Sequence, residues 1–161
     1  MKKILLAATL LITTACFSQE TITTTGGPEY QRAIGVKLSA GGAVTYKQFI
    51  ANTKALEAEA MFFSEGIRLI ALYEFHFYNI QGVDGLAWYV GPGAHVGFYR
   101  PRDKSFNTAA DIGIDGVIGL DYKIKNVPIN LSLDWQPSFS LIGNAPLMPQ
   151  FGGLGIRYIL Q

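Results

Sequence analysis

The sequence has little charge and almost no cysteine. Charged residues make up 16% of its 161 residues, and Cys16 is the only cysteine. If Cys16 is removed with an N-terminal signal, the chain can form no disulfide bond, so its stability outside a cell must come from another source. The formal net charge of +1 gives no support to a nucleic-acid-binding function.

Long apolar runs are also missing. Outside the N-terminus, no run reaches the roughly 18 consecutive apolar residues that a membrane-spanning helix requires. Hydrophobic residues nevertheless make up 49% of the chain, and there are 18 glycines. The apolar residues are therefore spread over alternating segments, which is typical of β-strands rather than helices. The length leaves room for one domain.

The N-terminus has the pattern of an export signal. Lys2 and Lys3 are followed by the apolar residues 4–12 (ILLAATLLI) and then by small and polar residues (TTACFSQE). We predict that residues 1–18 form a signal peptide that is cleaved off. Loss of its two lysines takes the formal net charge from +1 to −1.

A short polar lead-in, residues 19–30, separates this signal from the folded domain. It contains two glycines and a proline that interrupt regular structure, which leaves residues 31–161 for the domain itself. Lipidation of Cys16 is the alternative form of processing, although Thr13 stands where a lipobox usually has Leu. In both cases the chain leaves the cytoplasm.

Residues 86–99 (LAWYVGPGAHVGFY) alternate between two kinds of side chain. Every second residue from Leu86 to Phe98 is apolar, and the residues between them are small or polar, including three glycines and His95. Alternation with a period of two indicates a β-strand whose two faces have different surroundings.

Eight segments of this kind can be counted along the domain. Turn-forming residues join most of them, and two longer loops are expected at residues 100–108 and 143–150. Residues 53–62 could also form a helix, since Ala, Leu and Glu favour one, but their short length favours a strand. The predicted strands are 31–40, 43–51, 56–63, 67–78, 86–99, 110–125, 129–141 and 151–160.

The polar faces of these strands collect six basic and seven acidic side chains, among them Lys47, Glu57 and Glu59. The apolar faces of the six clearest strands carry no charge. A soluble barrel has the reverse pattern, whereas apolar-out and polar-in segments of about ten residues are typical of a transmembrane β-barrel. We therefore predict an all-β, eight-stranded, antiparallel up-and-down transmembrane barrel.

The lumen of such a barrel is only wide enough to be filled by side chains. We expect the charged side chains to form a network there rather than a path for ions, with glycines leaving space for the larger ones. The residues assigned to this network are Lys37, Arg68, Glu74, His76, His95, Asp111, Asp115, Asp121, Asp134 and Arg157. Aromatic residues are typical of membrane interfaces. The aromatic residues expected there are Tyr73, Trp88, Tyr122, Trp135 and Tyr158.

His76 and His95 have the chemistry of general bases or metal ligands, but no serine lies at a telling spacing and no further ligand is apparent. We expect both to pack in the lumen, and we expect no catalytic residue, cofactor or metal. Three cations of the longer loop, Arg100, Arg102 and Lys104, could contact anionic lipid phosphates but are expected to be solvated.

Four segments carry a family resemblance: VTYKQFI, WYVGPGAHVGFY, DIGIDGVIGLDYKIKNVPINLSLDWQP and FGGLGIRYIL. They resemble the small eight-stranded outer-membrane barrels of Gram-negative bacteria, the OmpA/OmpX-like class, and are most similar to uncharacterised members from the Bacteroidota. The C-terminus resembles the signal read by the outer-membrane barrel assembly machinery, with Gly155, Tyr158 and Leu160 in place. Such signals usually end in an aromatic residue, where this chain has Leu160 and Gln161.

This resemblance implies a location in the cell outer membrane, contact with outer-membrane lipid and insertion by that assembly machinery. Three classes of function remain open. The leading one is a monomeric, non-enzymatic protein with a structural or surface-interaction role and no open pore. The alternatives are a lipid-modifying barrel enzyme and a soluble exported barrel that binds an apolar ligand, as lipocalins do.

Overall fold

The structure is a computed structural model that describes most of the chain after residue 26. The described residues are 27–39, 41–64, 66–78, 80, 83–99, 110–142 and 147–160, without the side chains of residues 147–151. The predicted signal peptide at residues 1–18, Cys16 within it, most of the lead-in and the predicted loop at 100–108 lie outside the described residues.

Within the described residues, all regular structure is β-strand. Each strand pairs antiparallel with its neighbours in sequence, and the first also pairs with the last, which closes a barrel. The prediction of an eight-stranded antiparallel up-and-down barrel is therefore confirmed. The described part of the chain holds no helix long and apolar enough to cross a membrane. The strands are β1 (Arg32–Leu38), β2 (Gly42–Ala51), β3 (Lys54–Phe63), β4 (Gly66–Phe77), β5 (Leu86–Tyr99), β6 (Ala110–Lys123), β7 (Ile129–Ile142) and β8 (Leu147–Leu160).

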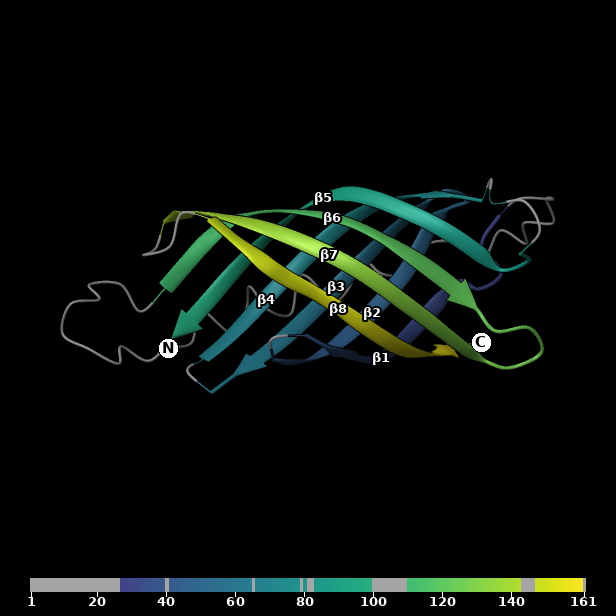
Figure 1. Ribbon diagram of the computed structural model, residues 1–161, viewed down its shortest axis with the longest axis horizontal. Helices are drawn as coiled ribbons and strands as arrows, with labels where there is room; N and C mark the ends of the chain where they lie inside the picture. The colour runs from purple at the N-terminus through teal and green to yellow at the C-terminus, as the bar shows by residue number, and fades with distance from the viewer. Residues whose placement is uncertain are drawn as a thin grey trace, which may run out of the picture.

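Both ends of the domain lie at one end of the barrel, because Arg32 at the start of β1 pairs with Leu160 at the end of β8. We call this the N-terminal end and the opposite one the far end. Figure 1 shows the strands running obliquely to the long axis of the molecule. Three connections lie at the N-terminal end, namely residues 52–53, 78–85 and 124–128.

The last strand begins earlier than predicted. β8 starts at Leu147 rather than at residue 151, so residues 147–150 of the expected loop belong to a strand, and residues 143–146 lie outside the described residues. The sequence suggested a loop because prolines are rare inside strands. Here Pro149 lies inside β8 where the register between β7 and β8 shifts: Gln136 pairs with Phe151 but Ser138 pairs with Met148, so β8 has one residue more than β7 at this point. A bulge of this kind tolerates residues that an unbroken ladder excludes.

The helical alternative for residues 53–62 is wrong. All residues of β3 pair with β4. Glu57 and Glu59 are buried, whereas Leu56, the residue before Glu57, is about half exposed, as expected for side chains that alternate along a strand. Pairing on both sides outweighs the modest helix propensity of Ala, Leu and Glu.

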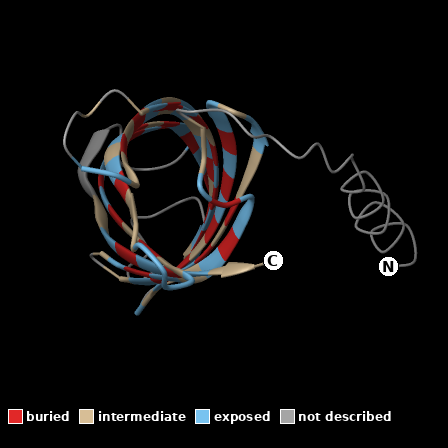
Figure 2. Cartoon of the chain, turned by 90° about the vertical axis from the view of Figure 1, so that its right-hand side faces the viewer, coloured by how far each residue is buried: buried red, intermediate tan, exposed pale blue. Residues whose placement is uncertain are grey.

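The two faces of the strands differ in chemistry. Figure 2 shows buried and exposed segments alternating along the strands around the barrel. Large apolar side chains are exposed on every strand, for example Val36 on β1, Ile114 on β6 and Leu133 on β7. The buried faces of the described strands instead carry four cations and seven carboxylates. These are Lys37, Lys47, Arg68 and Arg157, with Glu57, Glu59, Glu74, Asp111, Asp115, Asp121 and Asp134.

Candidate functional site in the barrel interior

Most buried charges form one group, which we call the central cluster: Lys37, Lys47, Glu57, Glu59, Glu74, Asp121, Asp134 and Arg157. Seven of the eight strands contribute to it, and alternation along each strand points these side chains to the inside. Lys37 Nζ lies 2.8 Å from Asp134 Oδ2 and also pairs with Glu59. Lys47 Nζ lies 2.8 Å from Glu74 Oε2.

Glu57 is the common partner of the three cations. Its carboxylate forms an ion pair with Arg157, lies 3.1 Å from Lys47 Nζ and lies 3.9 Å from Lys37 Nζ. All four side chains are fully buried. Desolvating charges costs several kcal/mol each, and such a group is stable only when the ions are paired and hydrogen-bonded.

Neutral donors supplement the three cations, because five carboxylates surround them. The Tyr89 hydroxyl donates to Asp134 Oδ2 at 2.8 Å, and Gln136 Nε2 donates to Glu59 Oε1 at 2.9 Å. A third carboxylate, Asp121, accepts hydrogen bonds at its Oδ2 from the Tyr30 hydroxyl at 3.0 Å and from Asn130 Nδ2 at 2.8 Å. Lys37 also contacts Asp134 Oδ2 and Glu59 Oε1, so the tyrosine and the amide add to that cation at these oxygens. Among the described ion pairs none reaches Asp121 Oδ2, which the neutral donors satisfy.

Four further ionisable side chains lie near the far end, and we call them the far-end cluster: Arg68, His95, Asp111 and Asp115. Arg68 Nη2 donates to Asp111 Oδ2 at 2.7 Å. His95 Nδ1 lies 2.9 Å from Asp115 Oδ2, and its Nε2 lies 3.2 Å from Asp111 Oδ2. The ring lies over Gly113, where a Cβ would stand 2.5 Å from His95 Cε1. The glycine therefore provides the space that this histidine needs.

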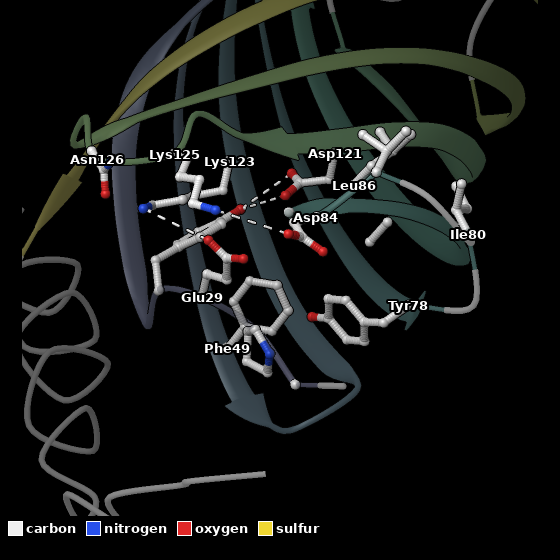
Figure 3. A pocket seen from close by; sticks show the side chains of 16 residues that line it. Glu29, Phe49, Tyr78, Ile80, Asp84, Leu86, Asp121, Lys123, Lys125 and Asn126 are labelled. Carbon is white, nitrogen blue, oxygen red and sulfur yellow. Dashed lines mark hydrogen bonds and ion pairs between the residues drawn. The ribbon is translucent and has the colours of Figure 1, made fainter. Parts of the chain in front are cut away.

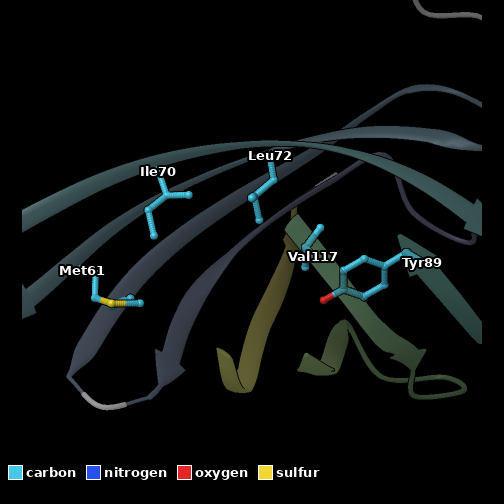
Figure 4. Close-up of a cluster of buried hydrophobic side chains, with 6 residues drawn as sticks. Met61, Ile70, Leu72, Tyr89 and Val117 are labelled. Atoms are coloured by element: carbon cyan, nitrogen blue, oxygen red, sulfur yellow. The ribbon is translucent and has the colours of Figure 1, made fainter. Parts of the chain in front are cut away.

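An apolar layer separates the two clusters. Figure 4 shows its side chains directed into the interior from different strands. Along β4, Ile70 and Leu72 lie between Arg68 of the far-end cluster and Glu74 of the central cluster. The layer consists of Ala43, Met61, Ile70, Leu72 and Val117, and Tyr89 joins it to the central cluster through its hydrogen bond to Asp134.

His76 is enclosed by aromatic rings beside the central cluster. Its ring stacks on Tyr89 with centroids 5.0 Å apart, stacks on Tyr78 at 6.3 Å and meets Phe49 edge-on at 4.7 Å. Its Nε2 lies 2.8 Å from Glu74 Oε2. The histidine therefore packs among rings and a carboxylate of its own barrel.

The two histidines differ in the partners of their ring nitrogens. A general base needs a free nitrogen lone pair within reach of a substrate proton. Both nitrogens of His95 face carboxylates. His76 Nδ1 has no hydrogen-bond partner among the described residues, but aromatic rings enclose the imidazole on several sides. Within the described residues, no group of three or more His, Cys, Asp or Glu side chains is placed to hold a metal ion.

All ten residues that the sequence assigned to a lumen network are buried in the structure, and they divide between the two clusters and His76. Lys47, Glu57 and Glu59 were predicted to lie on the polar faces but were not named in the network, although they lie at its centre. Their period-two positions in β2 and β3 were the signal for including them. Tyr30 was missed for a different reason, since it precedes the first strand and no periodicity marks it.

The five aromatic residues predicted for membrane interfaces lie on the outer face, but not all near strand ends. Trp135 and Tyr158 are more than half exposed. Trp88 stacks on Phe77 with ring centroids 4.2 Å apart, whereas Tyr73 meets Phe75 edge-on. Tyr122 lies at the N-terminal end, one residue before the end of β6. Tyr73 and Trp135 lie mid-strand instead.

A cavity of about 440 Å³ opens at the N-terminal end of the barrel (Figure 3). Phe49 and Tyr78 line it on one side, and Asp121 connects it to the central cluster. Two ion pairs cross its rim, between Lys123 and Glu29 at 3.7 Å and between Lys125 and Asp84 at 4.0 Å.

No protein-family model, curated protein or solved structure matches this chain.

Proposed function

We propose that this chain is an integral protein of the bacterial outer membrane, a closed eight-stranded β-barrel with a polar lumen, and that its role is structural or interactive rather than enzymatic. The loops at the far end would face the cell surface, with both termini in the periplasm. Outer-membrane lipid and the barrel assembly machinery are the partners that this proposal implies.

The observation that carries the proposal is the chemistry of the outer face. Each of the eight strands exposes large apolar side chains, whereas the charged residues that lie away from the strand ends are buried. Soluble monomers rarely expose continuous apolar patches larger than a few hundred Å². A belt of apolar residues around a closed barrel is the arrangement expected in lipid, where a barrel also satisfies every backbone polar group.

Two exposed cations on the outer faces of β1 and β3 also fit a barrel that lies in lipid. Arg32 and Lys54 are both exposed, and each is the first residue of its strand at the N-terminal end. Long basic side chains at such positions reach the headgroup region while their alkyl stems remain on apolar surface.

The absence of a pore in this proposal rests on the filled interior. The central cluster, the apolar layer and the far-end cluster follow one another along the barrel, and their side chains are almost fully buried. An eight-stranded barrel has space for such side chains and little else. A lipocalin-like function would instead need an open apolar pocket in the interior.

Detergent dependence tests the proposal. The domain should fold only in detergent or lipid, and the folded sample should migrate differently on a gel before and after heating. The same chain in which Leu120 and Leu133 are replaced by Lys serves as a control, because it should lose this folding. A monomeric protein that folds without detergent would overturn the membrane assignment and favour the lipocalin-like alternative.

A further inference from the structure

Tyr30 is buried although it lies outside every strand. Only 7% of its surface is exposed, and its ring meets Phe49 edge-on with centroids 5.1 Å apart. Its hydroxyl donates to Asp121, with the two carboxylate oxygens at 3.0 and 3.1 Å. A residue of the lead-in therefore reaches into the barrel and contacts the central cluster.

The segment that carries Tyr30, residues 27–31, is attached to the barrel at few points. Backbone pairing with β2 begins at Gln31, whose carbonyl accepts from Phe49 N at 2.8 Å. Before it, the only described ion pair is between Glu29 and Lys123, and it is partly exposed. Exposed pairs of this kind contribute about 0–1 kcal/mol. The Tyr30 side chain therefore provides most of the anchoring.

We propose that residues 27–31 form a plug segment, which docks in the N-terminal mouth through Tyr30 and can leave it without unfolding the barrel. Its departure would uncover Asp121, which already lines the mouth cavity, and so widen the opening from that cavity to the central cluster. The occupant of this docking site is a segment of the chain itself, and the proposal requires the barrel but not a membrane.

The partners of Tyr30 remain satisfied when it leaves. Asp121 keeps its hydrogen bond from Asn130 Nδ2 at 2.8 Å and its ion pair with Lys47 at 3.5 Å. Phe49 keeps its edge-on contact with His76. Removing the plug segment therefore leaves no buried charge without a partner, which is the condition for a barrel that stays folded.

Thiol labelling tests this docking directly. In a full chain with Cys16→Ser, the substitution Ala87→Cys places a single thiol in the mouth cavity. Ala87 pairs with Asp121 across β5 and β6, and only 2% of its surface is exposed. Adding Tyr30→Ala should raise the labelling rate by a water-soluble reagent at least about tenfold, because a hydrogen bond to a charged group and an aromatic contact are lost. Tyr30→Phe, which keeps the ring, should give an intermediate rate.

The matched control is Tyr46→Ala, the same substitution on the outer face of β2, which should leave the labelling rate unchanged. Heat-modifiable gel migration reports whether each variant is folded. Equal labelling rates with and without Tyr30 would overturn the proposal. A Tyr30→Ala or Tyr30→Phe chain that fails to fold would also overturn it, since the segment would then be part of the barrel core.

Alkaline titration gives a second readout on the natural chain. Burial and the neighbouring Asp121 carboxylate raise the pKa of the Tyr30 hydroxyl well above its ordinary value. Docking is therefore fully stabilised below the ordinary tyrosine pKa of about 10 and is lost as the pH rises through the raised pKa. The difference in ultraviolet absorbance between the natural chain and Tyr30→Phe, followed as the pH is raised, should show a tyrosine that ionises at a higher pH than a free tyrosine. Ionisation at the ordinary pH would mean that Tyr30 is not docked.

Discussion

At the scale of single residues, the interior depends on groups that serve several partners at once. Glu57 faces all three cations of the central cluster, and Asp121 joins that cluster to the mouth through Tyr30. Because these side chains are buried, removing one member leaves the others charged and without water. Such residues should be much more sensitive to substitution than paired charges at the rim.

Glu57→Gln should therefore destabilise the barrel strongly. The variant keeps the size of the side chain but removes the charge that Arg157 and Lys47 share, and breaking a buried pair costs about 3–5 kcal/mol. The measurement is the denaturant midpoint of the folded barrel. Glu29→Gln, at an exposed ion pair with Lys123, is the control and should change stability by no more than about 1 kcal/mol. Equal midpoints for the two variants would contradict the role assigned to Glu57.

At the scale of elements, each strand has two faces with different functions. The inward face supplies the charged clusters and the apolar layer, and the outward face supplies large apolar side chains. Since side chains alternate, a substitution at one position tests one face without touching the other. This makes the outer face of a central strand a direct probe of its surroundings.

Ile118→Arg should show whether the outer face meets lipid. Ile118 is about half exposed near the middle of β6. In a membrane, Arg at the midplane of a barrel costs about 2–4 kcal/mol, and near the interface only about 0–1 kcal/mol. The free energy of unfolding from lipid vesicles would be measured for this variant and for its control Gln48→Arg. Gln48 pairs with Arg32 at the N-terminal end. An unchanged stability for Ile118→Arg would argue against lipid at this face.

The strands and their order were predictable from the sequence because period-two alternation runs through nearly all of them. The barrel interior was harder to predict in detail. Ile70 and Leu72 share the inward face of β4 with Arg68 and Glu74, but apolar residues on both faces give no alternation to detect. The contacts of His95 at the far end form only because β5 and β6 lie side by side. The contact of Tyr30 with Asp121 comes from a chain segment without regular structure. Pairing across strands and docking of coil are not encoded in local periodicity.

At the scale of the whole molecule, three kinds of packing close the interior in series. Tyr30 lies at the mouth, the central cluster follows, and the apolar layer separates it from the far-end cluster. An apolar layer excludes ions even where water reaches its two sides, because transferring a charge into apolar surroundings is strongly unfavourable. Closure therefore does not depend on one residue.

The intact protein should accordingly give no large, steady currents in a planar lipid bilayer. The chain with Tyr30→Ala should also remain silent, because the central cluster and the apolar layer stay in place. Current recordings at several voltages on the reconstituted barrel provide the measurement. Stable, high-conductance openings of the natural chain would show that the interior is a solute channel.

The pairing of β1 with β8 has a consequence for the order of folding. Arg157 lies on the last strand, yet its partner Glu57 lies on the third, 100 residues earlier in the chain. Contacts of such sequence separation form late, because a long loop must close before they do. A nascent barrel without its last strand would therefore hold Glu57 without the guanidinium that pairs with it. Neutralisation of the interior and closure of the sheet become a single event, and a half-assembled intermediate carries an electrostatic penalty that only the arrival of β8 removes.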